Sequence, residues 1–278
     1  MAERVLIAGC GDVGNRLGRR LLEAGHEVWG LRRNVARLAP GLQPVDADLA
    51  DPASLAALPR DLTLVAYTAA ADGRSESDYQ TAYVQGLSNL LAALERQGQR
   101  PRRVIFTSST GVYGQDDGSW VDETSPTEPT SFTGRAMLDA ERVLAESPFP
   151  GTVVRLGGIY GPGRTRLVDQ VRRGEAVCPE DGPLYTNRIH SDDAAGILAH
   201  LLAMDDPEPV YLGVDGDPAD LCEVLTFLAH ELGVPAPRKG KSTRRAGSKR
   251  CSNRRILGAG YGFVYPSFRE GYRGMLAG

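Results

Sequence analysis

Short apolar runs alternate with longer amphipathic stretches along the first half of the chain, a pattern that predicts βαβ units and a parallel sheet. The predicted strands span residues 5–8, 27–31, 43–45, 62–67, 104–107 and 152–156. The predicted helices span residues 13–23, 51–58, 79–97 and 134–145. In the third helix, apolar side chains recur with a helical period at Tyr83, Leu87, Leu90, Leu91 and Leu94, so one face is expected to cover the sheet. This order of elements predicts a doubly wound α/β fold.

The second half of the chain is less regular. A Gly/Pro-rich turn at 161–163 is followed by predicted helices at 166–173, 192–202 and 219–232. None of these pieces is long enough to hold a core of its own. We therefore expect a small C-terminal lobe that is assembled from several excursions of the chain.

Composition places the chain among ordinary globular proteins. It has 278 residues, of which 41% are hydrophobic and 24% charged, and this excludes intrinsic disorder, collagen and coiled coil. No apolar run reaches the eighteen or so residues of a membrane helix, and the first residues lack the pattern of a secretory signal. The formal net charge of −3 argues against a nucleic-acid-binding protein. We expect neither membrane nor nucleic acid as a partner.

The four cysteines are Cys10, Cys178, Cys222 and Cys251, and they form neither C-x-x-C pairs nor a Cys/His cluster. This scatter predicts reduced thiols in a cytoplasmic protein and no metal site. A basic segment, residues 238–255, holds nine Lys or Arg side chains without an interleaved aromatic residue. One hypothesis is that this segment closes over a nucleotide-linked substrate, whereas stacking on single-stranded nucleic acid is not expected.

A glycine motif follows the first predicted strand. Gly9, Gly11 and Gly14 form G-x-G-x-x-G at the start of a predicted helix, with Asp12 and Val13 between the last two glycines. In this context the first glycine permits a tight turn, the second lets the backbone approach a pyrophosphate, and the third lets helix and strand pack closely. The helix amides then face the anion. We predict that these five residues bind a dinucleotide.

Two arginines follow the second strand. Arg32 and Arg33 stand where an enzyme that prefers NAD presents an acidic side chain to the adenosine ribose. A guanidinium suits a 2′-phosphate because its donors match phosphate oxygens. The cofactor is therefore predicted to be NADP, with NAD left open.

The order of elements also predicts a division into domains. Residues 1–156 are assigned to a Rossmann-type dinucleotide-binding domain and residues 157–278 mainly to the substrate-side lobe, with a return to the sheet around 187–213.

Further motifs resemble one family almost from end to end. Val104-Ile-Phe-Thr-Ser-Ser-Thr-Gly-Val-Tyr-Gly114, Arg155-Leu-Gly-Gly-Ile-Tyr-Gly-Pro162 and Asn187-Arg-Ile-His-Ser-Asp-Asp193 are similar to motifs of the extended short-chain dehydrogenase/reductases. That group includes nucleotide-sugar epimerases and dehydratases. The resemblance implies that the cofactor is contacted by Asp48, Leu49, Thr68, Ala69, Ala70 and Thr107, and that Ser109 is catalytic. It also implies homodimers that pair through the helices after the fourth and fifth strands.

The chain departs from this family at its catalytic pair. The family uses a tyrosine and a lysine four residues later, whereas alignment places Thr133 and Met137 at these positions, and no Y-x-x-x-K occurs in the sequence. A lysine ammonium lowers the pKa of the phenol from about 10 toward neutrality, and a threonine hydroxyl cannot titrate in that range. Thr133 is expected to hold a substrate oxygen together with Ser109, and Tyr113 is a candidate for the missing phenol.

Four other residues are candidates for substrate binding: Thr110, Arg164, Arg188 and His190. A pair of arginines can clamp an anionic diphosphate, and an imidazole titrates near neutrality. Each also has a structural interpretation. The arginines can be solvated side chains and Thr110 a chance hydroxyl at a strand end, while His190 can be a structural residue before a helix that Ser191 or Asp192 caps. Two functions stay open: an NADP(H)-dependent oxidoreductase or epimerase acting on a polar hydroxy or keto compound such as a nucleotide sugar, and a non-catalytic NADP(H)-binding regulatory or scaffold protein.

Overall fold

A seven-stranded sheet forms the centre of the fold in the computed structural model, which describes residues 2–241 and 247–277. Its strands are β1 (Arg4–Ala8), β2 (Glu27–Leu31), β3 (Gln43–Val45), β4 (Leu64–Tyr67), β5 (Arg103–Ser109), β7 (Gly151–Leu156) and β12 (Val210–Gly213). They lie in the order β12-β7-β5-β4-β1-β2-β3, and the pairs around β1 and β4 run parallel. The strand order reverses at β1, where loops on the two sides diverge and leave room for a ligand. The predicted doubly wound α/β fold is confirmed.

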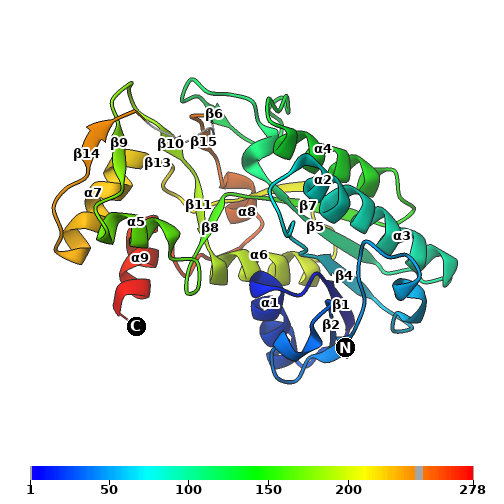
Figure 1. Cartoon of the computed structure of the whole chain (residues 1–278). Helices are drawn as coiled ribbons and strands as arrows, with labels where there is room; N and C mark the ends of the chain where they lie inside the picture. The colour runs from blue at the N-terminus through cyan, green and yellow to red at the C-terminus, as the bar shows by residue number, and fades with distance from the viewer. Residues whose placement is uncertain (1, 242–246, 278) are drawn as a thin grey trace. The chain divides into compact units, whose positions relative to one another are not determined.

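Helices cover this sheet, as Figure 1 shows. They are α1 (Asp12–Glu23), α2 (Glu76–Tyr79), α3 (Gly86–Arg96), α4 (Phe132–Ala145) and α6 (Ser191–Ala203), with a π-helical segment η3 (Gln80–Gln85) and 3₁₀ turns η1 (Val35–Arg37), η2 (Ser54–Ala57) and η4 (Thr110–Val112). Leu87, Leu90 and Leu94 are fully buried, so the apolar face predicted from their spacing covers the sheet. The helix predicted at 79–97 is present, but η3 interrupts its regular α-helical turns.

One predicted helix is wrong. Residues 51–58 form only the four-residue 3₁₀ turn η2. Pro59 follows directly, and Leu58 before it is extended with φ −63° and ψ 148°. A residue before proline is driven out of the helical region, and Pro52 removes a donor at the other end. The segment between these two prolines is therefore too short to propagate an α-helix.

The chain divides into two compact units. The first unit comprises Met1–Val112, Thr127–Arg155 and Ala195–Tyr211, and the second comprises Tyr113–Pro126, Leu156–Ala194 and Leu212–Gly278. In the first unit, buried Arg103 at the start of β5 donates to the carbonyl oxygens of Leu201 (3.2 Å) and Asp205 (2.9 Å). Because α6 ends at Ala203, the Leu201 carbonyl oxygen lies in its last turn without an intrahelical partner, and this guanidinium bonds both to it and to the segment after the helix.

The second unit contains short strands and helices. These are β6 (Trp120–Val121), β8 (Gly158–Tyr160), α5 (Arg166–Arg172), β9 (Val177–Pro179), β10 (Tyr185–Thr186), β11 (Arg188–His190), β13 (Ala219–Asp220), α7 (Leu221–Leu232), β14 (Arg238–Gly240), β15 (Arg250–Cys251), α8 (Arg254–Gly258) and α9 (Phe268–Ala277). The strands pair two by two as β10-β13, β11-β8, β14-β9 and β15-β6. Its apolar core brings together side chains of α5, α7 and α9, including Val168, Leu228 and Phe268.

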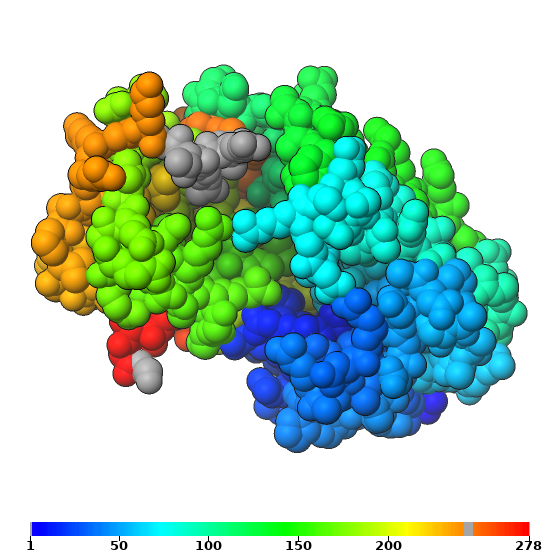
Figure 2. Space-filling view, viewed as in Figure 1, coloured from blue at the N-terminus to red at the C-terminus, as the bar shows by residue number. Residues whose placement is uncertain are grey.

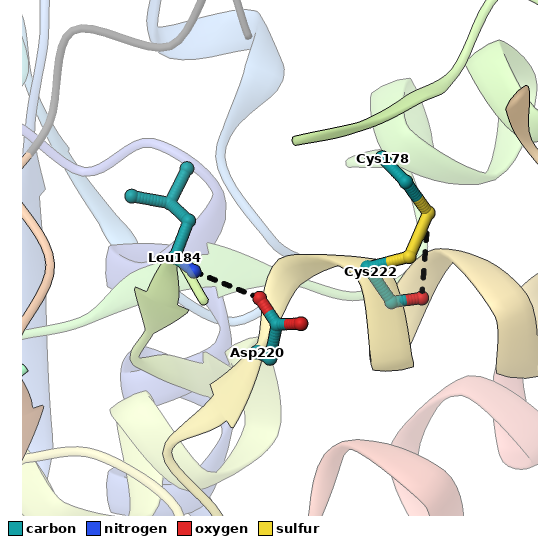
Figure 3. The surroundings of a disulfide bond; sticks show 4 residues. All are labelled: Cys178, Leu184, Asp220 and Cys222. Atoms are coloured by element: carbon teal, nitrogen blue, oxygen red, sulfur yellow. Dashed lines mark hydrogen bonds between the residues drawn. A yellow bond between two sulfur atoms is a disulfide. The ribbon is translucent and has the colours of Figure 1, made fainter. Parts of the chain in front are cut away.

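A disulfide joins Cys178 of β9 to Cys222 in the first turn of α7 (Figure 3). The expectation of reduced thiols at all four cysteines is therefore wrong for this pair, because β9 lies along α7 and brings the two Cα atoms to 4.7 Å. Just before α7, Asp220 accepts a hydrogen bond from the Leu184 amide at 2.8 Å. Cys10 and Cys251 are buried free thiols. No helix in residues 2–241 and 247–277 has the length and apolar character needed to cross a membrane.

Candidate functional site

The glycine loop lies at the carboxyl end of β1. Gly9 has a φ of +76°, and its amide and that of Cys10 both donate to the Leu31 carbonyl oxygen at 3.0 Å. A Cβ at Gly9 would stand 2.3 Å from the Cα of Ala69. The loop is therefore tied to the end of β2 and pressed against the segment after β4. Only glycine fits this turn, for its backbone angle and for lack of space.

The next two glycines of the motif differ from Gly9. A Cβ at Gly14 would meet the Thr68 hydroxyl at 2.8 Å, so this glycine lets α1 pack closely. A Cβ at Gly11 would meet no protein atom closer than 3.9 Å. The backbone at Gly11 is thus approachable from outside, at the start of a helix whose first amides point outward. Asp12 and Val13 begin that helix, and the Asp12 carboxylate accepts from Arg16 Nε at 2.9 Å.

The two arginines after β2 have different surroundings. Arg32 is half-buried and donates through Nη1 to the carbonyl oxygens of Cys10 (2.9 Å) and Arg37 (3.3 Å), so it braces the glycine loop. Arg33 is exposed, and its Nη2 lies 2.7 Å from both carboxylate oxygens of Asp72. This hydrogen-bonded pair raises the pKa of the Arg33 guanidinium. Burial raises the pKa of the neighbouring Cys10 thiol to about 12, so this cysteine is not a nucleophile.

The other residues expected at the cofactor lie in the same unit. The side chains of Thr68, Thr107 and Asp48 are hydrogen-bonded to backbone groups. Thr68 donates to the Gly9 carbonyl oxygen at 3.1 Å, and Thr107 to that of Tyr67 at 2.9 Å. The Asp48 carboxylate accepts from the Ala50 amide at 2.9 Å, within its own turn. The Leu49 carbonyl oxygen accepts from Asn89 at 2.9 Å. Ala69 is half-buried against Gly9 and Ala70 is exposed. These contacts fix the loops at the carboxyl ends of β1 and β4.

The hydroxyl groups predicted to hold a substrate oxygen follow β5 and open α4. Ser109 Oγ accepts from the Gly111 amide at 3.0 Å, and Thr110 lies half-buried in η4. Thr133 shares a 2.9 Å hydrogen bond with Ser131, which caps α4 by accepting from the Gly134 amide. A Cβ at Gly134 would stand 2.3 Å from the Gly111 carbonyl oxygen. The start of α4, and with it Thr133, therefore lies directly against the turn that follows Ser109.

A buried ion pair beneath this turn was not found from the sequence. Glu141 of α4 accepts from Arg155 of β7 at 2.7 and 3.0 Å, and from the Ser108 hydroxyl at 2.6 Å. The side chains of Glu141 and Arg155 are 8% and 7% exposed. The cluster ties β5, α4 and β7 together next to Ser109. No sequence spacing marks it, since the partners lie on separate elements.

In the second unit, Tyr113 is 2% exposed, which limits its access to a substrate. Its carbonyl oxygen accepts from Lys249 Nζ at 2.9 Å, and Lys249 is itself buried. This contact joins the lysine to the tyrosine backbone. Lys249 belongs to the basic segment 238–255, of which residues 242–246 lie outside the described part of the chain.

The other substrate candidates of the second unit divide into buried and exposed residues. Arg188 is 5% exposed and donates to the Thr186 carbonyl oxygen at 3.3 Å. His190 is 2% exposed, its Nδ1 accepts from the Asp192 amide at 3.2 Å, and its ring lies 4.0 Å from that of Tyr265. Arg164, in contrast, is exposed beside the turn at 161–163. Within the described residues, no cluster of three or more His, Cys, Asp or Glu side chains is arranged to hold a metal ion.

Comparison with known proteins places this arrangement in context. Residues 5–213 match the model of the NAD dependent epimerase/dehydratase family. The chain is 32% identical over 257 residues to the 3-diazoavenalumate denitrifying reductase of a Streptomyces species, covering 84% of this chain and 83% of that protein. It is 30% identical over 257 residues to the dTDP-6-deoxy-L-talose 4-dehydrogenase (NAD(P)(+)) of Kitasatospora kifunensis, with 84% and 80% covered.

Among solved structures, a "putative NAD-dependent epimerase/dehydratase" from Methylobacillus flagellatus is similar over its whole length. Its TM-score is 0.86 at 39% sequence identity, and the alignment covers 100% of this chain and 98% of that one. The likeness thus extends through both units rather than through the sheet alone.

Proposed function

Because the chain belongs to the NAD dependent epimerase/dehydratase family, we propose that it is an NADP(H)-dependent oxidoreductase acting on a polar hydroxy or keto compound. The observation that carries the proposal is the open backbone at Gly11. A Cβ at this position would have the Gly9 carbonyl oxygen as its nearest contact, at 3.9 Å. Gly9 and Gly14 are confined by protein atoms, whereas Gly11 leaves space next to the first amides of α1. Open space beside helix amides suits a pyrophosphate.

The residues around this loop fit a dinucleotide. We assign the pyrophosphate to Gly11, Asp12 and Val13, and the adenosine to the loops that contain Asp48 and Thr68–Ala70. Arg33 is exposed and suits the 2′-phosphate of NADP, while Arg32 holds the loop in shape. A bound nicotinamide would supply or accept a hydride. In this assignment the first unit binds the cofactor and holds the reacting oxygen of the substrate, and the second unit recognises the rest of the substrate.

Ser109 and Thr133 are proposed to hold the substrate oxygen. Ser109 Oγ is the acceptor in its bond with the Gly111 amide, so its own proton remains available for donation to a carbonyl oxygen. Thr133 contributes a second hydroxyl from the adjacent start of α4. Neither hydroxyl exchanges protons readily near neutral pH, and we propose that water completes the proton transfer. Names of relatives support this class of reaction, since one is a reductase and another a dehydrogenase that uses NAD(P)(+).

The second candidate is a protein that binds the dinucleotide without turnover. It is favoured by the absence of any Y-x-x-x-K from the sequence. A carbonyl-substrate panel, followed through the absorbance of the reduced nicotinamide, separates the two functions. Oxidation of NADPH with any carbonyl supports the enzyme, and tight binding without turnover across the panel supports the second candidate.

Binding itself is tested by titrating NADPH fluorescence against the wild type and two glycine variants. Gly9→Ala is expected to abolish binding and to lower stability by several kcal/mol, because it combines a positive φ with a clash at 2.3 Å. Gly25→Ala is the matched control, since Gly25 has a φ of +82° but nothing within 4 Å. It should cost about 1–2 kcal/mol and leave binding intact. Wild-type protein that binds neither NADPH nor NADH would contradict the proposal.

A further inference from the structure

The ion pair between Arg33 and Asp72 connects two loops at the carboxyl edge of the first unit's sheet. Arg33 lies two residues beyond the end of β2, and Asp72 lies in the segment between β4 and α2. Arg33 Nη2 is 2.7 Å from each Asp72 carboxylate oxygen. On the face shown in Figure 2, the blue loop that follows β2 and the cyan segment that leads into α2 both reach the molecular surface.

The position of this pair relates it to the glycine loop. The strands lie in the order β4-β1-β2, so loops after β4 and β2 flank the loop after β1. Gly9 is bonded to Leu31 at the end of β2 and is pressed against Ala69 after β4. The pair of Arg33 and Asp72 therefore bridges the loop after β2 and the loop after β4, on either side of the glycine loop at the carboxyl edge of the sheet. An adenosine ribose bound beside this loop would lie next to the Arg33 guanidinium.

The two arginines of this loop are not equivalent. Arg32 is half-buried and donates to backbone carbonyl oxygens at 2.9 and 3.3 Å, so its guanidinium stabilises the glycine loop. The Arg33 side chain is 59% exposed and its partner Asp72 is 71% exposed. An exposed pair of this kind contributes only about 0.2–1 kcal/mol, because water screens it. A phosphate dianion can offer Arg33 more charge and more acceptor oxygens than a carboxylate does.

We propose that Asp72 is a specificity-determining residue that occupies Arg33 in place of the 2′-phosphate of NADP(H). This inference rests on the proposed binding of a dinucleotide at the glycine loop. The 2′-phosphate must displace the Asp72 carboxylate from Arg33 before it can bind the guanidinium itself. NAD(H) carries no phosphate at that position and leaves the pair intact. Asp72 thus reduces the preference for NADP(H) over NAD(H) that Arg33 provides.

Calorimetric titration of the full-length protein with NADPH and with NADH tests this role directly, without reference to turnover. Asp72→Asn is expected to tighten NADPH binding about 2- to 5-fold, the gain that loss of an exposed ion pair allows, and to leave NADH binding unchanged. Arg33→Gln is expected to weaken NADPH binding at least 10-fold and to leave NADH unchanged. In the Arg33→Gln background, Asp72→Asn should have little further effect on NADPH, because Asp72 acts through Arg33.

The matched control is Asp61→Asn, which removes one exposed carboxylate before the amino end of β4, at the opposite edge of the sheet. An equal gain in NADPH affinity from this variant would assign the effect to net charge and overturn the proposal. So would an unchanged NADPH affinity in Asp72→Asn, an equal gain for NADH, or a gain that persists without Arg33. If the wild type binds neither dinucleotide, the proposed function fails first and the role of Asp72 falls with it.

Discussion

Two buried polar clusters, one in each unit, differ in whether their polar atoms are hydrogen-bonded. In the first unit, the Glu141 carboxylate accepts from Ser108 and Arg155 at 2.6 to 3.0 Å. In the second, the Tyr160 hydroxyl, Ser191 Oγ and Asp215 Oδ2 are buried with no hydrogen-bond partner among the described residues. Burial raises the pKa of Asp215 to about 8, so this carboxyl is neutral at moderate pH.

This difference shows that the two units accommodate buried polar side chains by different means. The closed ion pair of the first unit depends on both partners, because removal of either one leaves the other charge buried. The second unit instead keeps its carboxyl protonated and adds a covalent link between β9 and α7. We therefore expect the first unit to be sensitive to substitution, and the second to be sensitive to pH and to reductant.

The largest expected effect comes from opening the ion pair. Glu141→Gln removes the charge that compensates buried Arg155, and we expect the free energy of unfolding to fall by about 3–5 kcal/mol. Urea denaturation measures the change. Glu146→Gln, at the exposed end of the same helix, is the control and should shift stability by less than about 0.5 kcal/mol. If the two variants lose the same amount, the ion pair does not stabilise the first unit as described.

The next effect concerns the cross-link of the second unit. Reduction of the Cys178–Cys222 disulfide, which closes a segment with a sequence separation of 44, should lower the free energy of unfolding by about 2–4 kcal/mol. Denaturant unfolding with and without reductant measures this loss. The Cys178→Ser/Cys222→Ser variant should resemble the reduced protein and should not respond to reductant. Detection of all four thiols in unreduced, unfolded wild type would contradict the cross-link.

The smallest effect, taken over a single pH unit, is a dependence of stability on pH. Because the folded pKa of Asp215 lies above its ordinary value of 3.8, the folded state holds a proton that the unfolded state releases. The free energy of unfolding should therefore fall as pH rises from about 4 to 8, by up to about 1.4 kcal/mol per pH unit, and level off above about 8.

Asp215→Asn isolates this contribution. Its Oδ1 can still accept from the Asp217 amide, which donates at 3.1 Å in the native protein. Arg188, Asp193 and Asp217 are the charged groups that face this carboxyl, and all three remain. The difference in stability between wild type and variant should change with pH over this range. A constant difference from pH 6 to 8 would show that Asp215 does not titrate there.

Much of the first unit was predictable because apolar periodicity reports which face of an element is buried. The predicted strand at 27–31 agrees with β2, and the helix at 134–145 lies within α4. The glycine loop was also predictable, since its spacing reflects local backbone requirements at Gly9 and Gly14. The helix at 51–58 failed because the apolar pattern was counted without regard to Pro52 and Pro59.

The interior contacts of both units were not predictable from one sequence. Glu141 is separated from Ser108 by 33 positions and from Arg155 by 14, and the direction of each side chain is set by packing. The pairing of Cys178 with Cys222 likewise depends on β9 lying along α7. Motifs placed Arg188 and His190 among substrate-binding candidates, yet both are almost wholly buried. A motif identifies residue types at fixed spacing, whereas burial is a property of the whole fold.

The hydrogen bonds that Arg103 donates at the end of α6 have a consequence for biosynthesis. Its partners Leu201 and Asp205 leave the ribosome about one hundred residues after it, and the edge strand β12 follows them. Until then, a nascent chain has an unpaired guanidinium at the start of β5 and a bare sheet edge beside β7. Chains that stop at residue 156 should therefore aggregate in the cell. Translation must pass residue 213, the end of β12, before the seven-stranded sheet can be completed.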